Sequence, residues 1–105
     1  MIKSSFYTFV LEKGKRQAKH IVNGYSDGTF YYYKSSFGTW YAIHPLCGLS
    51  VATATTRKDA QQQAHSVKTA DGLKRANETS YLNRLTDQFY KAISELKKQE
   101  ATNND

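Results

Sequence analysis

The chain has 105 residues, a formal charge of +6 and a pI near 9.5, so it has the length of one domain and its charge favours acidic partners. Hydrophobic residues make up 39% and charged residues 23%, which excludes a compositionally disordered chain, and no apolar run is long enough for a membrane span or a secretion signal. A lone cysteine, Cys47, excludes an internal disulfide and suits the reducing cytoplasm.

The first half of the chain predicts an antiparallel meander of four or five strands. Runs rich in aromatic and branched residues, without internal Gly or Pro, cover residues 5–12, 20–22, 29–34, 39–44 and 49–53. Between them lie turn residues that tolerate a positive φ, among them Gly14, the Asp27-Gly28 pair and Gly38. Pro45 ends the fourth run because proline cannot donate to a sheet ladder.

A helix is predicted to follow at Thr56. Asp59 stands three residues after Thr56, a spacing similar to that of a capping box, and its charge suits the positive end of a helix. Gly72 is the predicted C-cap of this helix. The apolar residues of this segment recur at helical spacing and define one face: Ala60, Ala64 and Val67.

A second, longer helix is predicted to begin between residues 77 and 80. Its apolar stripe is formed by Leu82, Leu85, Phe89, Ala92 or Ile93, and Leu96. We interpret the stripe as the cover of the sheet, with a homodimer through this helix as the alternative because the spacing approximates a heptad. Residues 1–98 are therefore predicted to form one domain, and residues 99–105 a frayed tail.

These elements predict an α+β fold, in which an antiparallel sheet of four to five strands is followed by two C-terminal helices packed on one face. The other face is left for solvent or a partner. Side chains alternate between the two faces of a strand. In the third strand, Tyr31 and Tyr33 are therefore on one face and Phe30 and Tyr32 on the other. In the fourth strand, Trp40 and Ala42 are on one face and Tyr41 and Ile43 on the other. The pattern leaves open which face the helices cover.

The positive charge is concentrated in the first half. Residues 1–56 contain six basic and two acidic residues, whereas residues 57–105 contain nine basic and seven acidic ones. Interspersed signs are typical of a solvated helical surface, so the first half is the predicted partner-facing region.

Basic and aromatic residues together suggest a nucleic-acid site on the sheet. Lys and Arg neutralise phosphates, and aromatic rings stack on bases. The alternative is an ordinary solvated basic hairpin beside core aromatics. The candidates are Lys13, Lys15, Arg16, Lys19 and Lys34 for phosphates, Tyr31, Tyr33 and Trp40 for stacking, and Arg57 and Lys58 as a second anchor at the start of the first helix.

Catalytic and metal-binding patterns are weak. His20, His44 and His65 have no metal-ligand spacing, so neither a metal nor a cofactor is predicted. Cys47 and His44 are three residues apart and could form a nucleophile pair, but no acidic partner or oxyanion donor stands beside them in the sequence. We interpret Cys47 as a packed loop thiol and expect no enzyme.

From Gly38-Thr39-Trp40-Tyr41 to Thr56-Arg57-Lys58-Asp59-Ala60, about a quarter of its length, the chain resembles arm-type DNA-binding domains of phage and transposon integrases. Those domains place a three-stranded sheet in the major groove, with a helix behind it that begins with a similar Thr-basic-basic-acidic-Ala sequence. The resemblance implies binding alone, because no recombinase catalytic domain is present. The short basic chain is also similar to many small bacteriophage and mobile-element proteins, which implies the cytoplasm of a bacterial host cell.

The sequence thus favours a non-enzymatic module that engages nucleic acid or a host nucleoprotein through a basic sheet face. The alternative is a protein inhibitor of a host nuclease, similar to anti-CRISPR proteins, that binds the effector protein or its guide complex through apolar anchors. A small enzyme using His44 or Cys47 is the third hypothesis.

Overall fold

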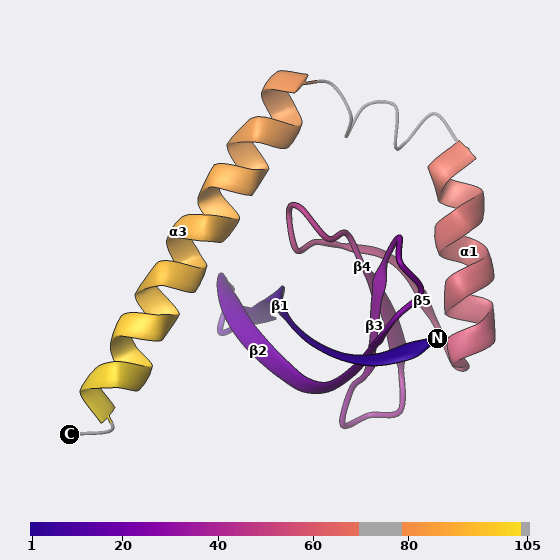
Figure 1. Cartoon of the computed structure of the whole chain (residues 1–105), viewed down its shortest axis with the longest axis horizontal. Helices are drawn as coiled ribbons and strands as arrows, with labels where there is room; N and C mark the ends of the chain where they lie inside the picture. Colours follow the sequence, from indigo (N-terminus) through magenta and orange to yellow (C-terminus); the bar gives the residue numbers. More distant parts are fainter. Residues whose placement is uncertain (70–78, 104–105) are drawn as a thin grey trace.

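A computed structural model of the chain describes residues 1–69 and 79–103. Within them, five strands form one antiparallel sheet in chain order, and two helices follow (Figure 1). This confirms the predicted α+β fold. The elements are β1 (Ile2–Glu12), β2 (Lys15–Ser26), β3 (Tyr31–Lys34), β4 (Trp40–Ile43), β5 (Ser50–Ala54), α1 (Arg57–Thr69) and α3 (Thr79–Asn103).

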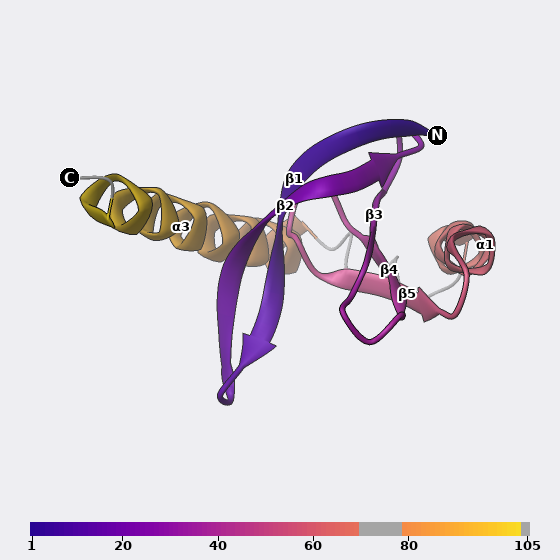
Figure 2. The ribbon, with the colours of Figure 1, turned by 90° about the horizontal axis from the view of Figure 1, so that it is seen from below.

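The β1–β2 hairpin is longer than the sequence indicates. Its two-residue turn has positive φ at Lys13 (52°) and Gly14 (77°), the geometry that suits the twist of a tight hairpin. The polar start of β2, with no strand pattern of its own, becomes a strand because it pairs with β1 as far as Glu12 and Lys15. An irregularity in the register between Ser4 and Phe6 bends the hairpin, and its far end projects away from the rest of the molecule (Figure 2).

The sheet curls back on itself. The Phe9 amide donates to the Gly48 carbonyl oxygen (2.9 Å), and the Thr8 hydroxyl donates to the same oxygen (3.0 Å), which joins β1 to the loop between β4 and β5. On the inner face of this curl, Phe6 of β1 stacks on Tyr31 of β3 with ring centroids 4.6 Å apart. One face of the sheet is therefore partly enclosed by the sheet itself.

Helix α1 packs on the opposite face of β3 to β5. The buried residues there are Phe30, Tyr32, Ala42, Ala60 and Ala64. The two alanines of α1 let the helix approach the sheet closely, and the alternation places Tyr32 and Ala42 beneath it. As predicted, Thr56 caps the helix: its side-chain oxygen accepts from the Asp59 amide (3.1 Å), an interaction that contributes about 1 kcal/mol.

Helix α3 covers the same face of the sheet at its other end. Phe89 is buried against Phe9 (ring centroids 5.0 Å apart), and the Lys97 ammonium lies 5.5 Å from the centre of the Tyr7 ring. The strand register puts Tyr7 and Phe9 on the face that carries Tyr32. Both helices thus share one face, as predicted, although the bend of the sheet places them on opposite sides of the molecule in Figure 1.

Helix α3 continues to Asn103, into residues 99–105, for which the sequence predicts a frayed tail. The apolar stripe ends at Leu96, but Lys, Gln, Glu and Ala occupy residues 97–101, and their high helix propensity sustains the helix without an apolar face. Gly72 and the side chains of Val67 and Leu82, which the sequence assigned to helix caps and faces, lie outside the described parts of the chain. Among the residues described, no helix is both long and apolar enough to cross a bilayer.

Candidate nucleic-acid interface

The end of the β1–β2 hairpin is a basic projection. Residues 12–17 are all exposed, and they include Lys13, Lys15 and Arg16 but a single carboxylate, Glu12. None of the three cations forms a salt bridge with any residue in 1–69 or 79–103. Their charges are therefore available to an anionic partner.

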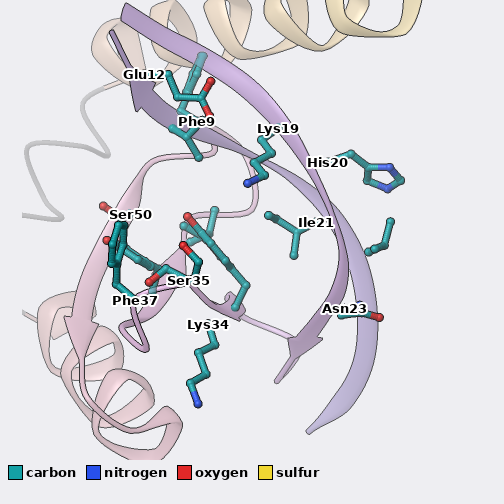
Figure 3. Close-up of a pocket in the computed structure, with 16 residues that line it drawn as sticks. Phe9, Glu12, Lys19, His20, Ile21, Asn23, Lys34, Ser35, Phe37 and Ser50 are labelled. Atoms are coloured by element: carbon teal, nitrogen blue, oxygen red, sulfur yellow. The ribbon is translucent and has the colours of Figure 1, made fainter. Parts of the chain in front are cut away.

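A groove lies beside this projection, between the β1–β2 hairpin and strands β3 and β4. Its volume is about 660 Å³. Lys19 and Ile21 extend into it from β2, whereas His20 points away (Figure 3). The opposite wall contains Tyr33 and Tyr41, and Lys34 lies at one end. The structure thus brings Lys19 and Tyr33, two of the predicted site residues, to one concave surface. Lys34 is at the edge of the groove, and because it pairs with Trp40 its side chain points to the other face of β3.

The two predicted stacking tyrosines of β3 differ in their environment. Tyr31 is half-buried under Phe6, so one face of its ring is already covered. Tyr33 stacks on Tyr41 with ring centroids 5.2 Å apart and planes 17° apart. Burial raises the pKa of the Tyr33 hydroxyl, and the neighbouring Tyr41 adds to this effect, so Tyr33 is a neutral hydrogen-bond donor in the groove wall.

The prediction that Trp40 shares a surface with Tyr31 and Tyr33 is wrong. Trp40 pairs with Lys34 in the β3–β4 ladder, so its ring lies on the face that α1 covers. There it packs against Tyr25, and the Arg57 guanidinium lies over both rings, 4.5 Å from the centre of Tyr25 and 6.0 Å from that of Trp40. Tyr25 lies within β2, which extends further than the sequence indicates.

Arg57 and Lys58 form a separate basic area. Together with Lys3 they line a shallow hollow between the start of α1 and the first residues of β1. Lys3 and Glu12 are at opposite ends of β1, and nine residues of strand span roughly 30 Å. The predicted second anchor therefore does not converge with the hairpin end on one contact surface.

Phe37 is an exposed aromatic residue that the sequence interpretation missed. Its side chain is 94% exposed, and it lies in the turn between β3 and β4 at the edge of the groove. A phenylalanine within Ser35-Ser36-Phe37-Gly38, where turn residues surround it on both sides, was the available signal. Among the aromatic side chains that the structure describes, the next most exposed is that of Tyr90, at 57%.

Asp27 organises the turn between β2 and β3 and joins it to α1. Its carboxylate accepts hydrogen bonds from two turn amides and three side chains: Thr29 (2.9 Å), Phe30 (2.8 Å), Tyr32 (2.7 Å), Gln61 (3.2 Å) and His65 (2.8 Å). Burial by itself would raise the pKa of Asp27, but the hydrogen bonds outweigh it and hold the pKa well below its usual range. We interpret this cluster as structural.

The low pKa of Asp27 leads us to expect that the free energy of unfolding decreases in acid. Because the folded pKa is below the unfolded one, the carboxylate contributes its full stabilisation above about pH 4, and this contribution declines as the pH falls further. Urea unfolding at a series of pH values should show a steeper decline below about pH 4 in the wild type than in Asp27→Asn. Parallel declines in the two proteins would contradict this role of Asp27.

The His44–Cys47 pair is not arranged as an exposed nucleophile. Cys47 is buried, and burial raises the pKa of its thiol despite opposing hydrogen bonds. His44 is also buried, which lowers its pKa, and its Nδ1 accepts from the Leu46 amide (3.2 Å). In the described parts of the chain, no three His, Cys, Asp or Glu residues are close enough together to hold a metal ion.

Comparisons with known proteins identify no relative: no protein-family model matches the chain, and neither a curated protein nor a solved structure matches it significantly.

Proposed function

We propose that the protein is a non-enzymatic nucleic-acid-binding module of phage or mobile-element type that acts in the bacterial cytoplasm. The observation that carries the proposal is the projecting end of the β1–β2 hairpin, where Lys13, Lys15 and Arg16 are exposed without an ion-pair partner in the described residues. Phosphate contacts from such cations supply most of the affinity of non-specific nucleic-acid binding. Lys19 and Lys34 extend the positive charge along the groove.

The geometry favours the hairpin rather than the face of β3 to β5 as the element that contacts a duplex. In the arm-type domains that residues 38–60 resemble, the sheet face opposite the helix enters the major groove. Here that face is partly covered, because Phe6 of β1 stacks on Tyr31. A two-stranded β-ribbon also fits the major groove, which is about 12 Å wide, and the hairpin end has this form.

Salt dependence tests the proposal. If the five cations of the hairpin and groove each contact a phosphate, the logarithm of the association constant should fall with the logarithm of salt concentration. The expected slope is about −4.5 for duplex DNA and about −3.5 for a single strand. Fluorescence anisotropy of labelled oligonucleotides, titrated with protein over a salt series, measures this slope. A slope near zero, or no binding at low salt, would contradict the proposal.

Charge reversal locates the contacts. Lys15→Glu/Arg16→Glu is expected to weaken binding more than about 10-fold at low salt and to make the slope about 2 units less negative. Lys91→Glu/Lys98→Glu is the matched control, because it changes the net charge equally at exposed residues of α3, outside the hairpin, the groove and the Arg57–Lys58 area. An equal loss in both variants would show that net charge alone attracts the nucleic acid.

Inhibition of a host nuclease is the second candidate function. It is favoured by the exposed apolar side chains near the groove, Phe37 and Val22, which are 94% and 64% exposed. Such side chains serve as anchors in protein interfaces. Capture of a defined nuclease that persists after nucleic acid is digested away would support this function over the first.

A further inference from the structure

The turn that carries Phe37 is closed by hydrogen bonds. The Ser35 amide donates to the Thr39 carbonyl oxygen (2.8 Å), the Gly38 amide donates to the Ser35 carbonyl oxygen (3.0 Å), and the Ser35 hydroxyl oxygen accepts from the Thr39 amide (3.3 Å). Gly38 has a φ of 85°, a conformation that other residues rarely adopt. These hydrogen bonds therefore fix the backbone of the turn, from which the Phe37 side chain extends into solvent.

Basic, aromatic and hydroxyl groups line the groove beside Phe37. Lys19 extends into the groove from β2, and Lys34 precedes the turn of Phe37 directly. Tyr33 and Tyr41 form the wall beside them, and Ser35 and Ser36 add hydroxyl groups. The groove thus combines cations with an exposed aromatic ring, the two features that single-strand-binding surfaces share.

The exposed ring at the groove suits an unpaired base. The hairpin forms one wall of the groove and strands β3 and β4 the other, with Phe37 at the edge. A base within a duplex has both of its faces stacked on neighbours, so it offers no face to Phe37. An unpaired base offers both, and stacking on an aromatic side chain contributes about 1–3 kcal/mol per base.

We propose that the groove binds single-stranded nucleic acid, with the Phe37 ring stacked on an unpaired base and Lys19 on a flanking phosphate. This inference rests on the proposed function and assigns its ligand: a strand with unpaired bases is bound in the groove while the hairpin end contacts further phosphates. Duplexes are bound through the cations, without stacking on Phe37.

The test compares a labelled oligothymidine, an oligouridine and a duplex of equal length by anisotropy. Phe37→Ala is expected to weaken binding of the single strands by about 5- to 150-fold and to leave duplex binding within about 2-fold. Phe37→Leu is the matched control, because it retains an apolar side chain but lacks a flat ring, and it should lose nearly as much. Phe37 is on the surface, so both variants should keep the circular dichroism spectrum of the wild type.

A second readout reports the stacking directly. Phe37→Trp should lose fluorescence on binding oligothymidine, after subtraction of the wild-type signal from Trp40, because a stacked base quenches indole. Tyr90→Trp places the same probe at an exposed position of α3, away from the groove, and should not be quenched.

The outcomes separate this inference from the function on which it rests. Salt-dependent binding that needs Lys15 and Arg16 but is unchanged in Phe37→Ala would overturn the single-strand site alone. Equal losses on single strands and duplex would also overturn it. Full affinity of Phe37→Leu for the single strands would overturn it too, because leucine has no flat ring on which a base can stack. No binding of any oligonucleotide at low salt would overturn the function and the inference together.

Discussion

Replacing Asp27 by alanine is expected to lower the free energy of unfolding by about 3–4 kcal/mol. The carboxylate accepts five hydrogen bonds, two from the turn before β3 and three from the side chains of Tyr32, Gln61 and His65. Hydrogen bonds to charged groups contribute more than neutral ones, and the buried Tyr32 hydroxyl would lose its acceptor. Thermal unfolding followed by circular dichroism should show a Tm more than about 10 °C lower.

Two variants define what Asp27 contributes. Asp27→Asn keeps an acceptor for the turn amides but not the charge, so its loss should be smaller than that of alanine. His65→Ala removes one donor from a side chain that is 43% exposed, and such pairs contribute at most about 1 kcal/mol. If Asp27→Ala is no less stable than His65→Ala, the carboxylate does not join the turn to α1 as we describe.

Replacing Phe89 by alanine is expected to destabilise the protein by about 3–4 kcal/mol, within the range for buried phenylalanines. The ring packs against Phe9 and lies directly over Gly48: a Cβ atom at residue 48 would be 2.4 Å from Phe89 Cε1. Gly48 also supplies the carbonyl oxygen that accepts from Phe9 and Thr8. The contact therefore supports both the position of α3 and the closure of the curled sheet.

A double-mutant cycle tests this contact from both sides. Gly48→Ala adds the Cβ atom at a φ of 70°, so it should be destabilising through overlap with Phe89 and through backbone strain. Phe89→Leu makes room for that atom, so the double variant should be less destabilised than the sum of the single variants, by about 1 kcal/mol. Additive losses in urea unfolding would show that Phe89 and Gly48 are not in contact.

Local sequence was sufficient for the elements and for their alternation. The meander, the helix start at Thr56 and the separation of Tyr31 and Tyr33 from Tyr32 were predicted, because each depends on neighbours a few residues apart. The predicted ends of the strands and helices were less accurate. The first three residues of β2 lack a strand pattern and follow their partner β1, and the last turn of α3 follows helix propensity alone.

The candidate site was predictable in composition but not in arrangement. Lys13, Lys15, Arg16 and Lys19 were identified from charge, and the structure places them on the hairpin and the groove that it borders. The sequence did not show that Trp40 lies on the helix-covered face. It also did not show that Arg57 and Lys58 lie beside the first residues of β1, at the opposite end of that strand from the hairpin turn. These positions depend on strand pairing and on the path of the sheet.

The sequence by itself determined the order of the strands and helices, the concentration of positive charge in the first hairpin and the two faces of each strand. Only the tertiary structure decided that the sheet curls, that Phe6 covers Tyr31 and that Phe37 stands exposed at the edge of a groove. The physical reason is the range of the interactions involved. Periodicity and turn chemistry act between near neighbours, whereas the curl depends on Thr8 meeting Gly48 across forty residues of chain.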